Sequence, residues 1–556
     1  MSNREIQICG DYAQAVFQRA NKAMEPRNFA PNWDDQPSRY KIYRQVERFP
    51  LPVKVPTSLA SMADILTRIN CPQVAARGLT FDELSLLLLL AHGMLSRRLG
   101  INWNRDNRDR SRYHQATYSR GTASGGGMYP TEIYWTCGPG GPLLSGLYHY
   151  DTAHHAMERL FTGDLTAKIQ ASVAGHPAAT STDQFLLISL NFWKNAFKYN
   201  TFAYHVVTQD LGALLGSLRL MATGFGSDLQ FLFWYPDEEL NRLLGLETLA
   251  ESVFVVVPIP TTAGISSTSM DSLQKPSLIN NVPSDFPTPD TSPVHKTSFQ
   301  RSRKIITFPL IEGVHQSALI EGEPRPDRSQ AFQASCDEFE TQGERVELPP
   351  PALELLQSDI VEIFKKRRSS FGRFSNHIPL HLSELATALY FGATARNYMS
   401  DLKQEDGTPH FTRLMVFVNN VEGLERGAYA YDRVRHCLWT VCKADMTNFL
   451  QHSYFLQNYN LVESGAVIAI VGRVGQMLEI YGNRGYRILN AEVGLVAQSL
   501  YMASAALSFG CGAALGFDNM AMNEVLALND ADEKSILFLL MGHERAGNAD
   551  FEYRLI

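Results

Sequence analysis

The 556 residues lack most of the signatures of metal, disulfide and membrane proteins. The seven cysteines are scattered, none in a Cys-x-x-Cys pair, and no His or Cys cluster accompanies them. This pattern argues against structural zinc and against a disulfide framework, and it fits reduced thiols in a cytoplasm. The first 20 residues hold no apolar core of signal-peptide type. The most apolar run, Leu84 to Leu95, is too short to span a bilayer and predicts a buried helix.

Several catalytic and binding motifs are missing as well. The sequence has no Gly-x-Ser-x-Gly elbow, no Walker loop and no His-Glu-x-x-His, and no Gly-x-Gly-x-x-Gly opens a helix after a strand. A net charge of -7 argues against general nucleic-acid binding. The composition, 45% hydrophobic and 19% charged, is that of a globular protein, and the length is too great for one core. We therefore expect a cytoplasmic protein of two or more domains, with no membrane or nucleic-acid partner.

A Ser-, Thr- and Pro-rich stretch from Thr261 to about Pro293 divides the chain near its middle. Its composition cannot bury enough apolar surface to repay the entropy of ordering. We interpret it as a linker, with a mobile lid as the alternative. The predicted organisation is an N-terminal extension (1–55), a first domain (56–260), a linker region (261–345) and a second domain (346–556).

The two halves repeat the same order of patterns. Gly-x-Tyr-x-Tyr-Asp occurs at 146–151 and again at 427–432, each time followed by His and an apolar finish, which predicts a two-stranded hairpin. Long segments of helical periodicity follow Tyr199 and Tyr481, and each half closes on a buried-strand run. A duplication of this length predicts two related domains.

The two copies have diverged in a complementary way. The first contains RGTASGGGMYP (120–130), and the corresponding place in the second has no glycine cluster. The second contains KKRRSSFGRF (365–374), and the first has no Arg-Arg-Ser. Each half thus keeps what the other has lost. Three consecutive glycines fit either a bare turn before a strand or backbone that lies against a ligand, and we favour the ligand.

SGGGMYPTE, GLYHYD and the Lys198-Tyr199 entry to a long helix resemble the SagB-type (McbC-like) dehydrogenases of the flavin-dependent nitroreductase superfamily. The resemblance covers about 59–260 and 346–542. It implies an α+β fold with a mixed, mainly antiparallel sheet flanked by helices in each of two tandem domains. Members are usually homodimers that bind FMN at the subunit interface. Here the two subunits would be fused as an internal pseudo-dimer, so the chain could function as a monomer.

The same resemblance implies a composite flavin site and a dead twin. Arginines beside a serine give a fork of donors suited to a phosphate, although a solvated basic helix end is the alternative interpretation. The twin would be inactive because Ile480-Tyr481 stands where the family has Lys-Tyr, and FWYP (233–236) stands where the second half has Gly-Phe-Asp. The implied residues are Arg367, Arg368 and Ser369 at the phosphate, Ser124, Gly125 and Gly126 from the first half, Leu515, Gly516 and Phe517 near the flavin, and Arg545 at a weakly defined basic position.

Lys198 and Tyr199 are the predicted catalytic pair, because a Lys-Tyr at this place is implicated in the azoline-oxidising branch. A lysine acts as a base near neutral pH only if burial or nearby cations lower its pKa. The alternative interpretation is an exposed helix lysine, which we also expect Lys194 to be. The sequence departs from the family after Tyr199, where YNTFAYHVV replaces Tyr-Gly-x-Arg-Gly-Tyr-Arg, and we expect His205 to be a packing residue rather than a base.

These features predict an FMN-dependent dehydrogenase that acts on a peptide or peptide-like natural product. The favoured reaction converts thiazoline or oxazoline to thiazole or oxazole, with oxygen reoxidising the flavin. The partners it implies are a cyclodehydratase or a carrier-bound intermediate. The alternatives are another oxidation, a nitro, quinone or ene reduction in the same fold, and a non-catalytic docking partner of a modification complex. Residues 1–55 would wrap the other domain, bind a partner or be partly mobile.

Overall fold

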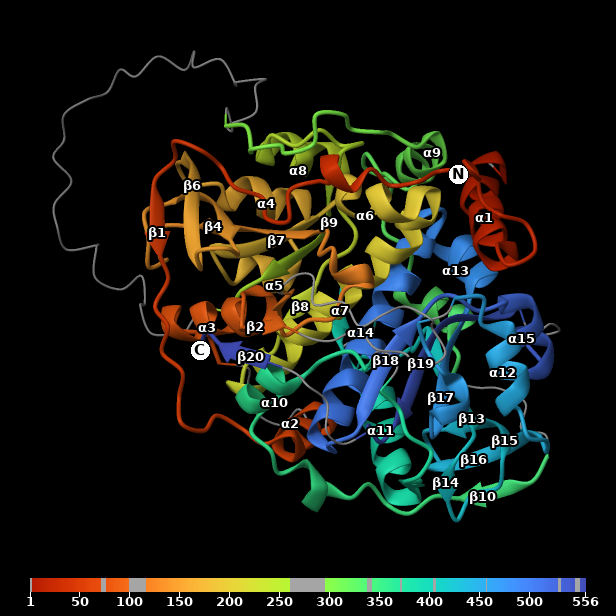
Figure 1. Ribbon diagram of the computed structural model, residues 1–556. Coiled ribbons are helices and arrows are strands. Elements are labelled where there is room, and N and C mark those ends of the chain that lie inside the picture. The colour runs from red at the N-terminus through yellow and green to blue at the C-terminus, as the bar shows by residue number, and fades with distance from the viewer. Residues whose placement is uncertain are drawn as a thin grey trace, which may run out of the picture.

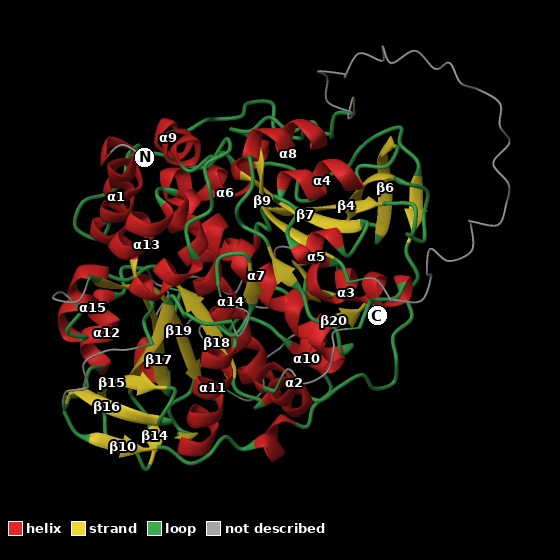
Figure 2. Cartoon of the chain, turned by 180° about the vertical axis from the view of Figure 1, so that it is seen from behind, coloured by secondary structure: helices red, strands yellow, loops and turns green. Residues whose placement is uncertain are grey.

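Two antiparallel sheets, one in each half of the chain, form the framework of the molecule (Figures 1 and 2). The computed structural model describes residues 3–71, 77–99, 117–260, 296–337, 343–370, 373–403, 407–456, 458–528, 532–545 and 551–556. The segment predicted to be a linker, 261–293, lies outside these residues.

Each sheet repeats the same strand order around a long hairpin, as the Gly-x-Tyr-x-Tyr-Asp motifs predict. All neighbouring strands in both sheets are antiparallel. The first sheet runs β1 (Arg48–Pro50), β6 (Ala156–Thr162), β5 (Gly146–Asp151), β4 (Thr131–Cys137), β7 (Gln184–Asn191) and β9 (Glu251–Pro258). The second runs β10 (Arg345–Glu347), β16 (Cys437–Cys442), β15 (Gly427–Asp432), β13 (Thr412–Val418), β17 (Ala466–Arg473), β19 (Glu533–Gly542) and β18 (Gly510–Ala514).

Alternate residues of the central strands enter two different cores. In β7, Leu186 and Ile188 join a cluster that extends through both halves, whereas Phe185 and Leu187 join a cluster confined to the first half. The second sheet divides its side chains in the same way between the shared cluster and one of its own. Since side chains of a strand alternate between faces, the inner faces of both sheets share one core.

The helices also follow one order in both halves. Two further helices, α1 (Asn3–Gln18) and α9 (Pro309–Ser317), lie outside the repeat, and α5 (Pro177–Thr180) occurs in the first half alone among the described residues. The corresponding pairs are α2 (Met62–Asn70) with α10 (Ile360–Lys366), α3 (Phe81–His92) with α11 (Leu382–Thr394), α4 (Thr166–Ser172) with α12 (Thr447–Ser453), α6 (Phe192–Tyr199) with α13 (Val474–Tyr481), α7 (Ala203–Gly224) with α14 (Arg484–Ala506), and α8 (Asp237–Leu244) with α15 (Asn519–Val525).

The aspartates near the start of α8 and α15 differ in their contacts. Asp518 does cap α15, where its side chain accepts from the amides of Met520 and Ala521. In α8, however, Asp237 is buried and pairs with Arg484 and Arg487 of the other half. The aspartate of the first half therefore joins the two domains rather than capping its helix.

The long helices α7 and α14 cross each other between the two sheets (Figures 1 and 2). At the crossing, a Cβ on Gly212 would lie 1.9 Å from the carbonyl oxygen of Ala491, and a Cβ on Gly494 would lie 1.9 Å from that of Gln209. The contacts are reciprocal, because Gly212 and Gly494 occupy the same place counted from Tyr199 and Tyr481. The crossing marks a pseudo-two-fold axis, and only glycine allows the backbones to approach so closely.

Smaller elements tie the halves together at their edges. Ser61 and Asp359, the N-cap residues of α2 and α10, pair through a bridge. Strand β8 (Gln230–Phe231) pairs with β12 (Met399–Ser400), and β20 (Phe551–Arg554) near the C-terminus adds to β2 (Ser96–Leu99), which also pairs with β3 (Thr117–Ser119). A last pair joins β11 (Leu380–His381) to β14 (Val421–Glu422) within the second half.

None of the described helices is long and apolar enough to cross a membrane.

Candidate functional site

The Ser/Gly loop lies between β3 and β4, at the interface of the two halves. Residues Gly125–Gly127 form a single 3-10 turn, in which Gly126 and Gly127 have φ values of 65° and 66°. Any other L-residue is strained there. Gly121 is enclosed, because a Cβ would meet the Leu90 carbonyl and the Phe364 ring, and Phe364 belongs to the second half. The glycines therefore serve two purposes, the turn itself and the close contact between halves.

Both long helices hold this loop. Asp210 of α7 accepts hydrogen bonds from the Ser124 hydroxyl and the Gly125 amide, each at 2.7 Å. Gln498 of α14 accepts from the Ala123 amide at 2.9 Å and donates to the Gly121 carbonyl at 3.0 Å. Burial raises the pKa of Asp210 to about 7, and the two hydrogen bonds oppose this shift. The loop is thus fixed from each half at once.

Lys198 and Tyr199 lie directly against Gly126. A Cβ on Gly126 would be 2.5 Å from the Tyr199 hydroxyl and 2.7 Å from Lys198 Nζ. Lys198 is half-buried, no carboxylate pairs with it among the described residues, and its Nζ lies 5.1 Å from the centre of the Tyr199 ring. Burial lowers the pKa of Lys198 and raises that of Tyr199. A lysine with a lowered pKa beside a bare backbone is chemically suited to accept a proton.

Two neighbours of this pair settle earlier expectations. Lys194 is not a surface lysine, because its side chain is buried and pairs with Glu132 of β4, which lies opposite this turn of α6. Lys194 Nζ also donates to the Tyr129 carbonyl at 3.4 Å. His205 is a packing residue, as expected. It is buried between Tyr486 at 2.7 Å and Gln209 at 3.0 Å, and burial lowers its pKa to about 3.

The residue after the pair is held in an unfavourable conformation. Asn200 has φ 45° and ψ −134°, a region open to glycine and strained for other residues. Gly482 takes the corresponding place after Tyr481, with φ 60° and ψ −158°. The backbone turn is therefore common to both halves, and only the first half holds it with a side chain.

Arg367 brings the second half to the start of the same loop. Its Nη2 donates to the Arg120 carbonyl at 3.0 Å, and the guanidinium lies 5.5 Å from the centre of the Tyr501 ring. Only 5% of the residue is exposed, yet its Nε and Nη1 have no hydrogen-bond partner among the described residues. Burial lowers the pKa of Arg367. Two buried, unpaired donors on a cation form a site that an anion would satisfy.

The other two residues of the Arg-Arg-Ser motif have partners. Arg368 pairs with Glu544 at 2.6 Å at the surface, and the Ser369 hydroxyl contacts the Tyr501 hydroxyl at 3.1 Å. A cavity of about 270 Å³ opens beside them. It is lined mainly by cations and small residues, with two acids: Arg98, Lys366, Arg368, Tyr501, Ser504, Ala505, Ser508, Phe509, Gly510, Glu544, Glu552 and Arg554.

The segment Leu515–Phe517 packs against residues 454–456 of the second half. Gly516 lies against Tyr454 and Leu456, and its carbonyl accepts from the Phe455 amide at 2.8 Å. Phe517 is buried, and its ring contacts Tyr454 at 5.0 Å between centres. Burial raises the pKa of Tyr454, with a smaller contribution from nearby Tyr199. Tyr454 is therefore buried against this segment, on the side where Tyr199 acts on its pKa.

Arg545, the last of the residues predicted near the phosphate, contacts two loops of the second half. Its side chain pairs with Glu463 at 3.2 Å, and its amide donates to the Arg373 carbonyl. The sequence prediction also missed Asp210, Gln498 and Tyr501. From the long helices, Asp210 and Gln498 face the loop, and Tyr501 faces the Arg-Arg-Ser motif. Helical periodicity identifies the helix without indicating which polar residue faces the interface.

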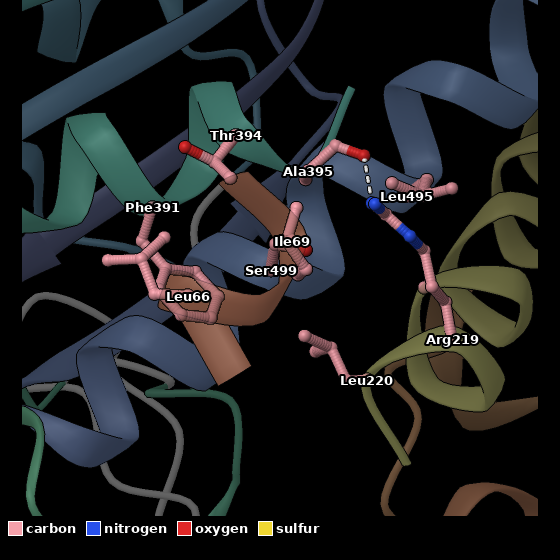
Figure 3. A pocket seen from close by; sticks show the side chains of 10 residues that line it. Leu66, Ile69, Arg219, Leu220, Phe391, Thr394, Ala395, Leu495 and Ser499 are labelled. Atoms are coloured by element: carbon pink, nitrogen blue, oxygen red, sulfur yellow. Dashed lines mark hydrogen bonds between the residues drawn. The ribbon is translucent and has the colours of Figure 1, made fainter. Parts of the chain in front are cut away.

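The pseudo-symmetric twin of this site is filled with side chains. Trp234 stands where the other site has Gly516. Its indole N–H donates to the Glu323 carbonyl, and its ring centre lies 6.4 Å from that of Tyr481. Lys403 and Glu492 form a fully buried ion pair where the first site has its loop and Asp210. Arg219 extends from α7 to the Ala395 carbonyl at 2.8 Å (Figure 3). The cavity left beside Arg219 measures about 10 Å³, no more than one water molecule requires.

Comparison with known proteins places this geometry in a family context. Residues 409–543 match the family model described as Nitroreductase family. A solved structure of a candidate nitroreductase from Anabaena variabilis is 22% identical, covers 97% of this chain and 99% of that one, and superposes with a TM-score of 0.71. Its fold confirms the predicted α+β architecture with two tandem nitroreductase-like domains.

Two further matches cover parts of the chain. A candidate nitroreductase of Methanocaldococcus jannaschii is 27% identical over 190 residues, which are 34% of this chain and 93% of that protein. The E. coli microcin synthetase McbBCD complex with truncated pro-MccB17 bound is 13% identical over 32% of this chain and 70% of the matched one. The TM-score of that superposition is 0.27.

Proposed function

We propose that this chain, which carries a Nitroreductase-family domain and a nitroreductase-like fold, is an FMN-dependent oxidoreductase with a single composite site. The observation that carries the proposal is one loop with two ends of different chemistry. Its Arg120 carbonyl receives the buried Arg367 of the second half, and its Gly126 lies against Lys198 and Tyr199 of the first. An anion-binding end and a proton-accepting end are thus joined by bare backbone.

The donor set fits FMN. The Nε and Nη1 of Arg367, which have no partner among the described residues, are buried donors that suit a phosphate. The nearby Ser369 hydroxyl contacts the hydroxyl of Tyr501, whose ring lies beside the same guanidinium. Arg368 is bound to Glu544 at the rim of the cationic cavity, so it would contribute charge rather than a buried hydrogen bond. The bare turn of Gly126 and the aromatic walls from Tyr199 and Tyr454 suit a planar ring. When bound, the flavin would supply the hydride acceptor.

Lys198 is the proposed base. It has no carboxylate partner among the described residues, and burial lowers its pKa, so a larger fraction is neutral and able to accept a proton from a substrate carbon. The Tyr199 hydroxyl, beside the same glycine, would orient the substrate or relay the proton. Dehydrogenation of a thiazoline or oxazoline to the azole would remove two hydrogens. One would leave as a proton to Lys198 Nζ, and the other as a hydride, for which the bound flavin would be the acceptor. Oxygen, reduced to hydrogen peroxide, would close the cycle.

We infer the finer assignment, a SagB-type dehydrogenase acting on a peptide or peptide-like natural product, from the Ser/Gly loop, the hairpin motif and the Lys-Tyr pair together. A cyclodehydratase or a carrier protein would then present the substrate. The filled twin site supports one flavin per chain, and the internal pseudo-dimer makes the site complete in a single molecule.

The test begins with the absorption spectrum and flavin content of the purified full chain. We expect one FMN per chain, and two would refute the single-site arrangement. Arg367→Ala should lose most of the flavin, whereas the adjacent Arg368→Ala should retain more. Lys198→Ala should keep flavin and lose conversion of a synthetic thiazoline peptide to a product with two fewer hydrogens. Lys168→Ala, at an exposed lysine, is the matched control.

The outcomes separate this function from its alternatives. Conversion of a nitroaromatic compound or a quinone with a nicotinamide cofactor, without thiazoline oxidation, would assign a reductase. Absence of flavin under all conditions would leave a docking partner of a modification complex.

A further inference from the structure

The N-terminal helix lies on the pseudo-two-fold axis. Its Tyr12 ring packs edge-on against Tyr204 and Tyr486, with ring centres 5.9 and 5.6 Å away and interplanar angles of 88° in both cases. Tyr204 and Tyr486 are corresponding residues, five positions after Tyr199 and Tyr481. Figures 1 and 2 show α1 beside α13 and α9. A single helix on a two-fold axis can serve only one of the two related sites.

The second half has an arginine that supports the filled twin site. Arg484, three residues after Tyr481, donates to the Phe233 carbonyl at 2.7 Å and to the Asp237 carboxylate at 2.5 Å. Those contacts hold the segment that leads from β8 to α8. In the first half the corresponding position is Phe202, which offers no donor. The matching segment, Leu515 to the start of α15, would therefore lose its support.

Arg19, just beyond the end of α1, makes the missing contacts. Its guanidinium lies 4.6 Å from the centre of the Phe202 ring. It donates to the Leu515 carbonyl, and to the Asn519 side-chain oxygen at 2.8 Å. Leu515 corresponds to Phe233, since each precedes the first residue of α15 or α8 by four positions, and Asn519 corresponds to Asp237. The two arginines thus bind the same pair of sites from different parts of the chain.

We propose that Arg19 is a positioning residue, supplied by the N-terminal extension in place of the arginine absent at position 202. It holds the Leu515–Phe517 segment against α7, and its role toward a flavin rests on the proposed function. Burial lowers the pKa of Arg19 to about 10, so the side chain remains charged at neutral pH. The Phe202 ring cannot donate a hydrogen bond, and it instead stabilises the Arg19 guanidinium through a cation–π contact.

Hydrogen exchange of the full chain tests the support directly. In Arg19→Ala, amide exchange between 511 and 518 should accelerate about tenfold or more, since hydrogen bonds from a charged group are lost. Exchange between 229 and 236, which Arg484 supports, should not change and serves as an internal control. Arg27→Ala is the matched variant, because Arg27 lies in the same extension and forms an exposed ion pair with Glu25. Arg19→Lys keeps the charge and one donor direction, and should fall between the two.

Rescue completes the test. Phe202→Arg in the Arg19→Ala background should restore slow exchange at 511–518, because the side chain would then start where Arg484 starts. Flavin affinity, measured by fluorescence titration with FMN, should weaken in Arg19→Ala and recover in the double variant. Unchanged exchange at 511–518, or equal acceleration in both segments, overturns the support. Faster exchange with unchanged flavin affinity overturns the link to the flavin site. A protein that binds no flavin contradicts the proposed function, while the exchange result still decides the role of Arg19.

Discussion

Two adjacent glycines of the Ser/Gly loop allow backbone strain and side-chain contact to be measured separately. Gly126 and Gly127 have φ values of 65° and 66°, so alanine at either position incurs the same left-handed penalty, about 1 kcal/mol. Their surroundings differ. A Cβ on Gly127 meets nothing within 4 Å, whereas a Cβ on Gly126 meets Tyr199 Oη at 2.5 Å and Lys198 Nζ at 2.7 Å.

The contact sets the size of the functional effect. Ordinary van der Waals contact begins at 3.4 Å, so Gly126→Ala must displace the hydroxyl by about 0.9 Å and the amine by about 0.7 Å. Both atoms are the far ends of side chains that can move, so the added cost in stability is small. A displacement near 1 Å of a reacting group costs on the order of 100-fold in rate. We expect Gly126→Ala to lower kcat by about that factor, with Gly127→Ala within a few-fold of the parent.

Urea unfolding and turnover of flavin-loaded protein check the pair. Both variants should lose about 1 kcal/mol in the free energy of unfolding, and only Gly126→Ala should lose turnover. Equal turnover in the two variants would refute the placement of Lys198 and Tyr199 at this glycine. A loss of several kcal/mol in Gly126→Ala alone would show that the neighbours cannot move aside.

Three further predictions concern the same interface. Burial raises the pKa of Asp210 from 3.8 to about 7 in the folded state, so this state binds a proton that the unfolded state has released, and stability should fall as pH rises from about 4 to 7. Asp210→Asn should flatten that part of a profile of melting temperature against pH, and an unchanged slope would contradict this prediction. Asn200→Gly should raise the free energy of unfolding in urea by about 1 kcal/mol, because the strain at φ 45° outweighs the entropy cost of glycine. Destabilisation would mean that the hydrogen bond from the Phe202 amide to the Asn200 side chain contributes more than the strain. Gly212→Ala should lower the free energy of unfolding by about 3 kcal/mol or more, because the new Cβ would lie 1.9 Å from the Ala491 carbonyl oxygen. Gly216→Ala should have a much smaller effect in the same assay, because the atom nearest to its new Cβ lies 3.1 Å away.

The duplication and the fold were predictable because they rest on local, repeated signals. Gly-x-Tyr-x-Tyr-Asp fixes a hairpin in each half, and each long helix carries its own periodicity. The meeting of Arg367 with the Ser/Gly loop also follows from a pattern, the complementary loss of motifs between the halves. That inference needed a family resemblance as well, because no spacing rule relates residues 120 and 367.

The residues whose environment the sequence did not indicate have partners that are distant along the chain. Lys194 resembles a surface lysine until Glu132 of β4 is placed opposite it, and Asp237 resembles a helix cap until the arginines of the other half reach it. Arg19 has no counterpart in the repeat, so comparing the halves could not find it. Only the three-dimensional position of α1 on the axis relates it to Phe202.

The covalent joining of the two domains changes what a single substitution can do. In a symmetric homodimer every substitution appears twice, so a residue that fills one cavity fills both, and a tryptophan such as Trp234 would abolish all activity at once. In this chain each position is encoded separately. Trp234 and the Lys403–Glu492 pair can turn one cavity into packed core, while the opposite side keeps Gly516 and its loop. Under the proposed function, the fusion leaves one of two equivalent sites for the flavin and fills the other with packed side chains.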